Sequence, residues 1–239
     1  MSSHEQVKKL KGHTEHILDL FIGLREQYRF LEPMLFNKRV AKRFSGGAKN
    51  RGFNVIKYSL FFSCVQDVAN LALDADKRTP SLTKVLNVLA DLKVKEILKK
   101  EYSVWNIPIP DDQPIVVRAA LERMEKRETE KRAKDFDRIF KRLYRRWDKL
   151  TTSNSLSAFS VVRDKYTAHK EIHLDGDKYK LFDIGTLELK WKDLNSIINS
   201  LRLIVLDVNL LVRNASFNFE AFEDGLSSSV KSFWARKSA

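Results

Sequence analysis

The segment "SLSAFSVVRDKYTAH", residues 155–169, decides the reading of the whole chain. In its first half the apolar side chains recur at the spacing of one helix face: Leu156, Phe159 and Val162. Its second half is polar and contains Arg163, Asp164 and His169. The segment therefore predicts an amphipathic helix that ends in a group of polar, chemically versatile side chains.

Helical spacing continues on both sides of this segment. Glycine and proline are scarce, with 8 and 5 among 239 residues. Apolar residues recur mainly three and four positions apart, which is typical of amphipathic helices. We expect helices over about residues 14–31, where Pro33 lies just past the end, 53–73, 82–92 with Ser81 as a cap, 115–150, 156 onward, and 194–212.

Three segments break the helical pattern. The stretch "NKRVAKRFSGGAKNRG", residues 37–52, predicts a basic loop that is flexible at Gly46 and Gly47. The stretch "HLDGDKYKLFDIG", residues 173–185, predicts a turn or short hairpin, because Asp175-Gly176 suits a tight turn. The C-terminal tail, residues 226–239, looks weakly anchored.

We therefore predict one all-α helical bundle over residues 1–239, with a long charged helix pair and a short loop or hairpin after residue 169. Only the proline-rich loop at residues 105–114 resembles a domain boundary, and neither half of the chain would form a stable helical bundle alone. The single cysteine, Cys64, excludes an internal disulfide, and its apolar surroundings predict a core residue.

The charge balance favours an anionic partner. The formal net charge is +13, as in many proteins that bind RNA, DNA or acidic proteins. We see no apolar run long enough to span a bilayer and no apolar core of a signal peptide near the N-terminus. The sequence thus predicts a cytoplasmic protein that needs no membrane.

Three interpretations of the polar segment "RDKYTAHKEIH" compete: half of a zinc site, a metal-free ribonuclease site, or the polar end of an ordinary helix. His169 and His173 would share a face of one helix, as zinc ligands often do. However, Glu171 stands midway between them, which fits neither the metalloprotease order nor its inverted form. We therefore predict no metal and no cofactor.

The spacing of Arg163 and His169 resembles the signature of the HEPN superfamily (higher eukaryotes and prokaryotes nucleotide-binding), which is Arg, four to six residues, then His. Asp164 stands directly after the arginine and Ala168 directly before the histidine, as is common in that superfamily. Together with the basic, helical chain, these residues look like the HEPN branch linked to abortive phage infection. The bare pattern is short, so the helical layout carries much of the resemblance.

The resemblance implies a metal-independent endoribonuclease of a toxin or defence system. The RNA's own 2′-hydroxyl attacks the adjacent phosphate and leaves a 2′,3′-cyclic phosphate and a 5′-hydroxyl. His169 would move the proton, because a histidine titrates near neutral pH. Arg163 would hold the phosphate, and Asp164 would orient Arg163 or His169.

The resemblance also implies a homodimer. On an α-helix, residues six apart point about 120° away from each other, so one continuous helix cannot aim Arg163 and His169 at one phosphate. Either the helix breaks near Ala168 or two chains contribute, and in HEPN nucleases two protomers meet at their motifs. An antitoxin or a nucleotidyltransferase is a further expected partner.

Nine other side chains are candidates for RNA contact. Each has an ordinary alternative, since charged helix faces are usually solvated surface and tyrosines usually pack. They are Lys165, Tyr166, Arg142, Arg145, Arg146, Lys38, Arg39, Lys42 and Arg43. Two further functions stay open: a non-catalytic HEPN module that binds nucleic acid or a partner protein, and a helical scaffold.

Overall fold

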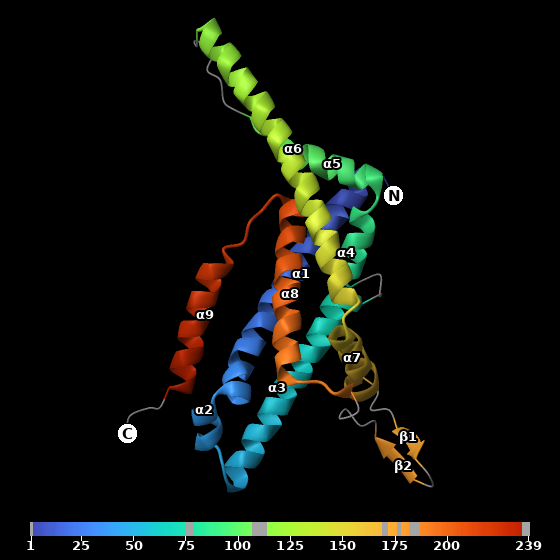
Figure 1. The fold of residues 1–239 in the computed structure, drawn as a ribbon, viewed down its shortest axis with the longest axis vertical. Helices are drawn as coiled ribbons and strands as arrows, with labels where there is room; N and C mark the ends of the chain where they lie inside the picture. The colour runs from blue at the N-terminus through green and yellow to red at the C-terminus, as the bar shows by residue number, and fades with distance from the viewer. Residues whose placement is uncertain are drawn as a thin grey trace.

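The structure is a computed structural model, which describes residues 2–74, 79–106, 114–168, 172–175, 178–181 and 187–235, with backbone alone for 166–168 and the two strands. It is an all-α bundle of HEPN-like layout with one small hairpin (Figure 1). In chain order the elements are α1 (Ser3–Phe36), α2 (Lys38–Arg43), α3 (Gly47–Leu73), α4 (Leu82–Leu89), α5 (Leu92–Ser103), α6 (Ile115–Thr151), α7 (Asn154–Val162), the π-helix η1 (Arg163–Ala168), β1 (Ile172–Asp175), β2 (Lys178–Leu181), α8 (Trp191–Arg213) and α9 (Phe219–Trp234).

Helices α1, α3 and α8 form the centre of the bundle. Helix α8 packs along α1, and most of the residues on its inward face are apolar, which makes it the core helix of the fold. On α3, Cys64 is fully buried, as its apolar surroundings predict. Burying these faces together removes the apolar surface that no single helix could hide alone.

Helix α6 has two different halves. Its C-terminal half packs on α5 and α8 through Phe136, Ile139, Leu143 and Leu150, which are buried, with Phe140 and Trp147 partly buried beside them. Its N-terminal half extends away from the body of the bundle (Figure 1). The long charged helix predicted over residues 115–150 is α6, with 37 residues, and α1 is the next longest with 34.

The first helix is longer than predicted at both ends. It starts after Ser2, whose side chain accepts from the Glu5 amide while the Glu5 carboxylate accepts from the Ser2 amide. It also continues through Pro33 to Phe36. A proline inside a helix forfeits one hydrogen bond, but Leu31 and Met34 on either side are buried and hold the last turn in place.

The third predicted helix is two helices. Asp91 accepts hydrogen bonds from the amides of Lys93 and Val94, so it caps a new helix, α5. This changes the direction of the chain, and Leu92, predicted to face the core, is 75% exposed. Ser81 precedes α4, but its hydroxyl donates to the Asp74 carbonyl instead of capping the helix.

Most of the predicted basic loop over residues 37–52 is helical. The Asn37 side chain accepts from the amides of Arg39 and Val40, and this cap starts α2. Helix α3 then begins at Gly47 rather than near residue 53. The turn between α2 and α3 needs both glycines, because Gly46 has φ 94° and Gly47 has φ 54°.

The weak anchoring expected for residues 226–239 does not describe residues 226–235. They belong largely to α9, which lies against α1 (Figure 1). Glu223 accepts from the nearly buried Arg25, and the Phe30 and Phe233 rings meet edge to face at 5.4 Å. Partners distant in the sequence therefore hold this segment, and its own composition did not reveal them.

The predicted hairpin is present, with β1 and β2 antiparallel and Asp175 paired with Lys178.

Helix α8 is long and apolar enough to cross a membrane by length and composition, which the sequence analysis did not predict. Its apolar side chains lie in the core, and the core helix of a bundle passes the same test.

Candidate functional site

The apolar face of α7 fixes the position of the polar segment. Leu156, Phe159 and Val162 are all buried, as predicted, and α7 packs mainly on α3. The Ser153 side chain caps the helix by accepting from the Leu156 amide at 3.4 Å. The buried face of α7 therefore fixes where the polar residues of η1 begin. The π-helix η1 also contacts α3.

The α-helix changes into a π-helix at Arg163. Helix α7 ends at Val162, and residues Arg163–Ala168 have the wider i to i+5 turn. The angular spacing of an ordinary α-helix, on which the predicted 120° separation depends, does not apply along this stretch. The break expected near Ala168 thus starts at Arg163 itself, and π-helical turns occur often at functional sites.

Arg163 and Asp164 contact each other within this π-helical stretch. Arg163 Nε donates to Asp164 Oδ1 at 2.7 Å, and the side chains are 23% and 53% exposed. Neighbouring residues on a helix do not normally face each other, so this pair needs the arginine to fold back along its own turn. The Nε edge of the guanidinium is bound to Asp164, and the Arg163 side chain is partly exposed.

The rest of the predicted catalytic group is only partly described. His169 lies outside the described residues, and so does Glu171. His173 and Tyr166 are described by their backbone positions, on β1 and η1. Lys165 is half-buried on the same turn as Arg163. Among the side chains that the structure does describe, no three of His, Cys, Asp and Glu come together as metal ligands would, and this set excludes both histidines of the zinc hypothesis.

The arginines predicted on α6 have an internal partner, Asp207 on α8. Arg142 and Arg146 both donate to this carboxylate, each with a closest distance of 2.5 Å. The Asp207 hydrogen bond is the main cause that raises the pKa of Arg142. Arg145 is exposed and makes no hydrogen bond or ion pair with the described residues. Two of the three candidates therefore stabilise the α6–α8 contact.

Asp207 was missed in the sequence, although it left a signal there. It stands in an apolar helix, three residues after Ile204 and one before Val208, which both face the core. A carboxylate on the inward face of a helix requires a cation opposite it. The arginine-rich second half of α6 provides that cation.

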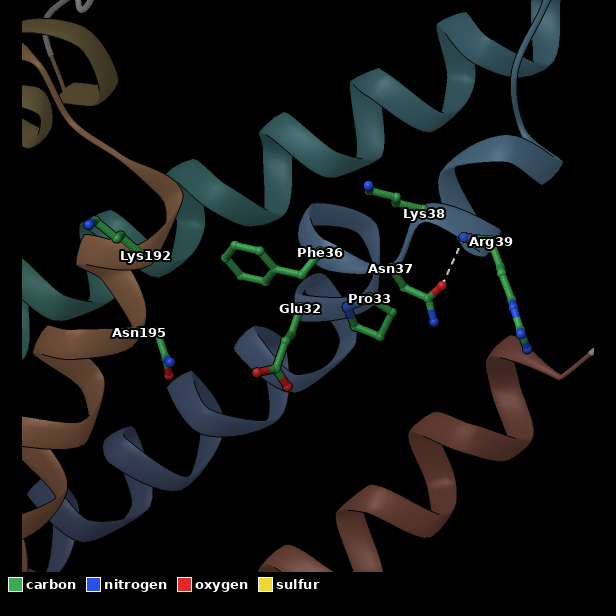
Figure 2. A pocket seen from close by; sticks show the side chains of 8 residues that line it. All are labelled: Glu32, Pro33, Phe36, Asn37, Lys38, Arg39, Lys192 and Asn195. Carbon is green, nitrogen blue, oxygen red and sulfur yellow. Dashed lines mark hydrogen bonds between the residues drawn. The ribbon is translucent and has the colours of Figure 1, made fainter.

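The four basic residues predicted near residue 40 lie on α2, and two of them, Lys38 and Arg39, border an open groove of about 800 Å³ at the junction of α1, α2 and α8. Figure 2 shows the groove, with the Phe36 ring between Lys38 and Lys192. A second groove, of about 850 Å³, shares Pro33, Asn37 and Arg39 with the first and continues towards α9. It is lined by Lys42 and Arg43, with Arg43 donating to the Trp234 carbonyl.

The candidates thus occupy separate places. Figure 1 shows α2 apart from η1, and the Asp207 cluster lies where α6 crosses α8. The fold brings Arg163 and Asp164 together, and brings Lys38, Arg39, Lys42 and Arg43 together, but it does not merge these groups within one chain.

Comparison with known proteins supports the HEPN-like layout of the helices. The family model AbiU2, of the HEPN type, matches residues 7–233, which is nearly the whole chain. No curated protein and no solved structure matches the chain. The family match includes the α1–α2 region and α9, which the seven-residue motif left unexplained. The chain therefore belongs to the AbiU2 family, a HEPN-type family of abortive-infection proteins.

Proposed function

We propose that this HEPN-type abortive-infection protein is a metal-independent endoribonuclease. The observation that carries the proposal is the Arg163–Asp164 pair, held at 2.7 Å on a π-helical turn directly after a buried helix. A guanidinium that is positioned by a carboxylate and partly exposed is suited to bind a phosphate as its charge develops. Family membership supports the defence role, and the catalytic role is our inference.

In the proposed reaction the 2′-hydroxyl of RNA loses its proton to a base and attacks the adjacent phosphorus. The bond to the 5′-oxygen then breaks, and that oxygen takes a proton. We assign His169 to the proton transfers, Arg163 to the phosphate and Asp164 to holding Arg163. The products are a 2′,3′-cyclic phosphate and a 5′-hydroxyl.

We further propose that the active form is a cytoplasmic homodimer with two motifs at one seam. One chain offers a single Arg163 and a single His169 to a phosphate, and a two-fold arrangement doubles both. Light scattering at micromolar concentration tests this proposal, because a monomer alone would contradict it. An antitoxin or nucleotidyltransferase partner stays a prediction, which co-purification with neighbouring gene products tests.

The decisive experiment is RNA cleavage in EDTA with four proteins: the wild type, His169→Ala, Arg163→Ala and Arg163→Lys. We expect EDTA-resistant cleavage that falls by about 10²- to 10⁴-fold in His169→Ala, the usual contribution of general acid–base catalysis. Arg163→Lys keeps the charge but loses the planar fork, so it should recover only part of the activity. Cleavage that His169→Ala leaves intact would reveal a contaminating nuclease and contradict the proposal.

A second function has an observation in its favour. The cations of the α1–α2 groove are exposed, which suits a module that binds nucleic acid without cutting it. RNA binding by a wild-type protein that never cleaves would support this alternative.

A further inference from the structure

The α1–α2 groove pairs an exposed aromatic ring with exposed cations. Phe36, the last residue of α1, is 50% exposed and is one of several large apolar side chains on the surface of the described residues. Lys38 and Lys192 flank the ring from α2 and α8 (Figure 2). These three residues come from separate elements, so the arrangement is a product of the fold and not of one charged segment.

Asn37 fixes the backbone at the junction that carries Phe36 and Lys38. Its amide donates to the Pro33 carbonyl at 3.1 Å, which closes α1, and its side chain caps α2. The chain therefore turns sharply between the aromatic residue and the first cation. Phe36 and Lys38 are held on adjacent helices, with Arg39 one residue further on.

The groove's cations have no anionic partner in the described part of the protein. Lys38, Arg39 and Lys192 make no side-chain hydrogen bond or ion pair with the described residues. The single carboxylate of the first groove, Glu32, is bound to Arg29 at 2.6 Å. Arg142 and Arg146 on α6 differ, because both donate to the Asp207 carboxylate. The groove therefore presents positive charge to an external anion.

We propose that this groove binds single-stranded RNA, with one base stacked on Phe36 and the flanking phosphates held by Lys38, Arg39 and Lys192. Each nucleotide has one flat ring and one negative charge, which is the pairing the groove offers. An acidic peptide supplies charge, but it does not place a flat ring beside each charge as a nucleic acid does. The second groove, with Lys42, Arg43 and Lys231, continues the path for a polymer. The proposal rests on the proposed function, as a substrate-holding surface away from Arg163.

The test is binding of a fluorescein-labelled 12-nucleotide RNA, measured by anisotropy in EDTA with His169→Ala present in every protein so that the RNA stays intact. Phe36→Ala should weaken binding by about fivefold to a hundredfold, the range for loss of one base–aromatic stack. Phe36→Leu should bind as weakly, and Phe36→Tyr should bind like the parent. Met124→Ala, on the exposed half of α6, is the control and should change nothing. Thermal unfolding followed by circular dichroism checks that each variant folds.

The lysines are tested by salt dependence. Lys38→Gln with Lys192→Gln should reduce the slope of log affinity against log salt by about 1.4, since each single-strand phosphate contact contributes about 0.7. The control pair, Lys93→Gln with Lys126→Gln, removes the same charge elsewhere on the surface and should leave the slope nearly unchanged. An equal loss in both pairs would mean diffuse attraction and would overturn the proposal. So would displacement of the RNA by poly-glutamate as effectively as by poly-uridine.

Failure of this proposal differs from failure of the proposed ribonuclease. Weaker binding in Phe36→Ala, with no cleavage by the wild type, keeps the groove and removes the enzyme. His169-dependent cleavage, with unchanged binding in Phe36→Ala, keeps the enzyme and overturns the groove.

Discussion

Asp207 on α8 receives two hydrogen bonds from Arg142 on α6, with Arg142 Nη2 at 2.5 Å from Oδ1 and Arg142 Nε at 3.2 Å from Oδ2. Arg146 Nη1 donates to the same carboxylate at 2.5 Å. Asp207 is 4% exposed, whereas the two arginines reach solvent. The buried carboxylate of Asp207 thus connects the long helix α6 to the core helix α8.

The first prediction concerns this connection. Asp207→Ala should lower the free energy of unfolding by about 1–3 kcal/mol, because it removes charge-assisted hydrogen bonds while the arginines can turn to water. Arg145→Ala, one residue before Arg146 and without a described partner, should change it by less than about 0.5 kcal/mol. Urea unfolding measures both. Equal stability of Asp207→Ala and the wild type would show that the cluster contributes nothing.

The second prediction concerns the docking of α9. Glu223 accepts a hydrogen bond from Arg25, which is 8% exposed, and forms an ion pair with Arg29, whose Nε lies 3.2 Å away. Glu223→Ala leaves Arg25 nearly buried with no carboxylate, which should cost about 3–5 kcal/mol. Hydrogen exchange should then speed up across α9 more than elsewhere. Asp224→Ala removes the neighbouring exposed charge and is the control; if it loosens α9 as much, the buried pair is not the cause.

The helices could be predicted from the sequence, whereas the ion pairs of Asp207 and Glu223 could not. Helices α3, α6 and α8 follow from apolar spacing, which is a local signal. Buried Leu156, Phe159 and Val162 were identified in the same way. The extension of α1 through Pro33 was missed, because packing of Met34 overrides the local preference of proline.

The candidate site shows the same limit. The polar segment was located by its residue types, and the sequence pointed to Arg163 and Asp164 as neighbours. The π-helical turn has no residue signature, and Asp207 and Phe36 depend on contacts between elements far apart in the chain. Such contacts appear only when the helices are placed.

The third prediction uses two buried acidic protons. Burial raises the pKa of the Cys64 thiol to about 12 and that of the Tyr144 hydroxyl to about 12. Their unfolded-state values lie near 8.5 and 10, so the unfolded chain releases these protons first as the pH rises. The stability they contribute is therefore complete below pH about 8.5 and is lost between there and about 12.

Urea unfolding at pH 7, 9 and 10 measures this loss. Cys64→Ala should show a shallower decline than the wild type, although its stability at pH 7 will be lower because of the cavity. A thiol reagent offers a second measurement: Cys64 should stay unmodified in the folded protein and react once per chain in urea. Rapid modification of the folded protein would contradict its burial.

The last prediction tests whether Asp164 positions Arg163. In Asp164→Asn the side chain keeps its size but loses its charge, so the 2.7 Å bond to Arg163 Nε weakens and the guanidinium can turn away from the phosphate. We expect kcat for RNA cleavage to fall by about 5- to 150-fold, which corresponds to about 1–3 kcal/mol of lost transition-state stabilisation. KM should change little, because most RNA affinity comes from other cations. Lys165→Gln, the adjacent residue, should raise KM and leave kcat nearly unchanged. If Asp164→Asn changes KM alone, Asp164 influences RNA only through its charge, and the positioning role is wrong.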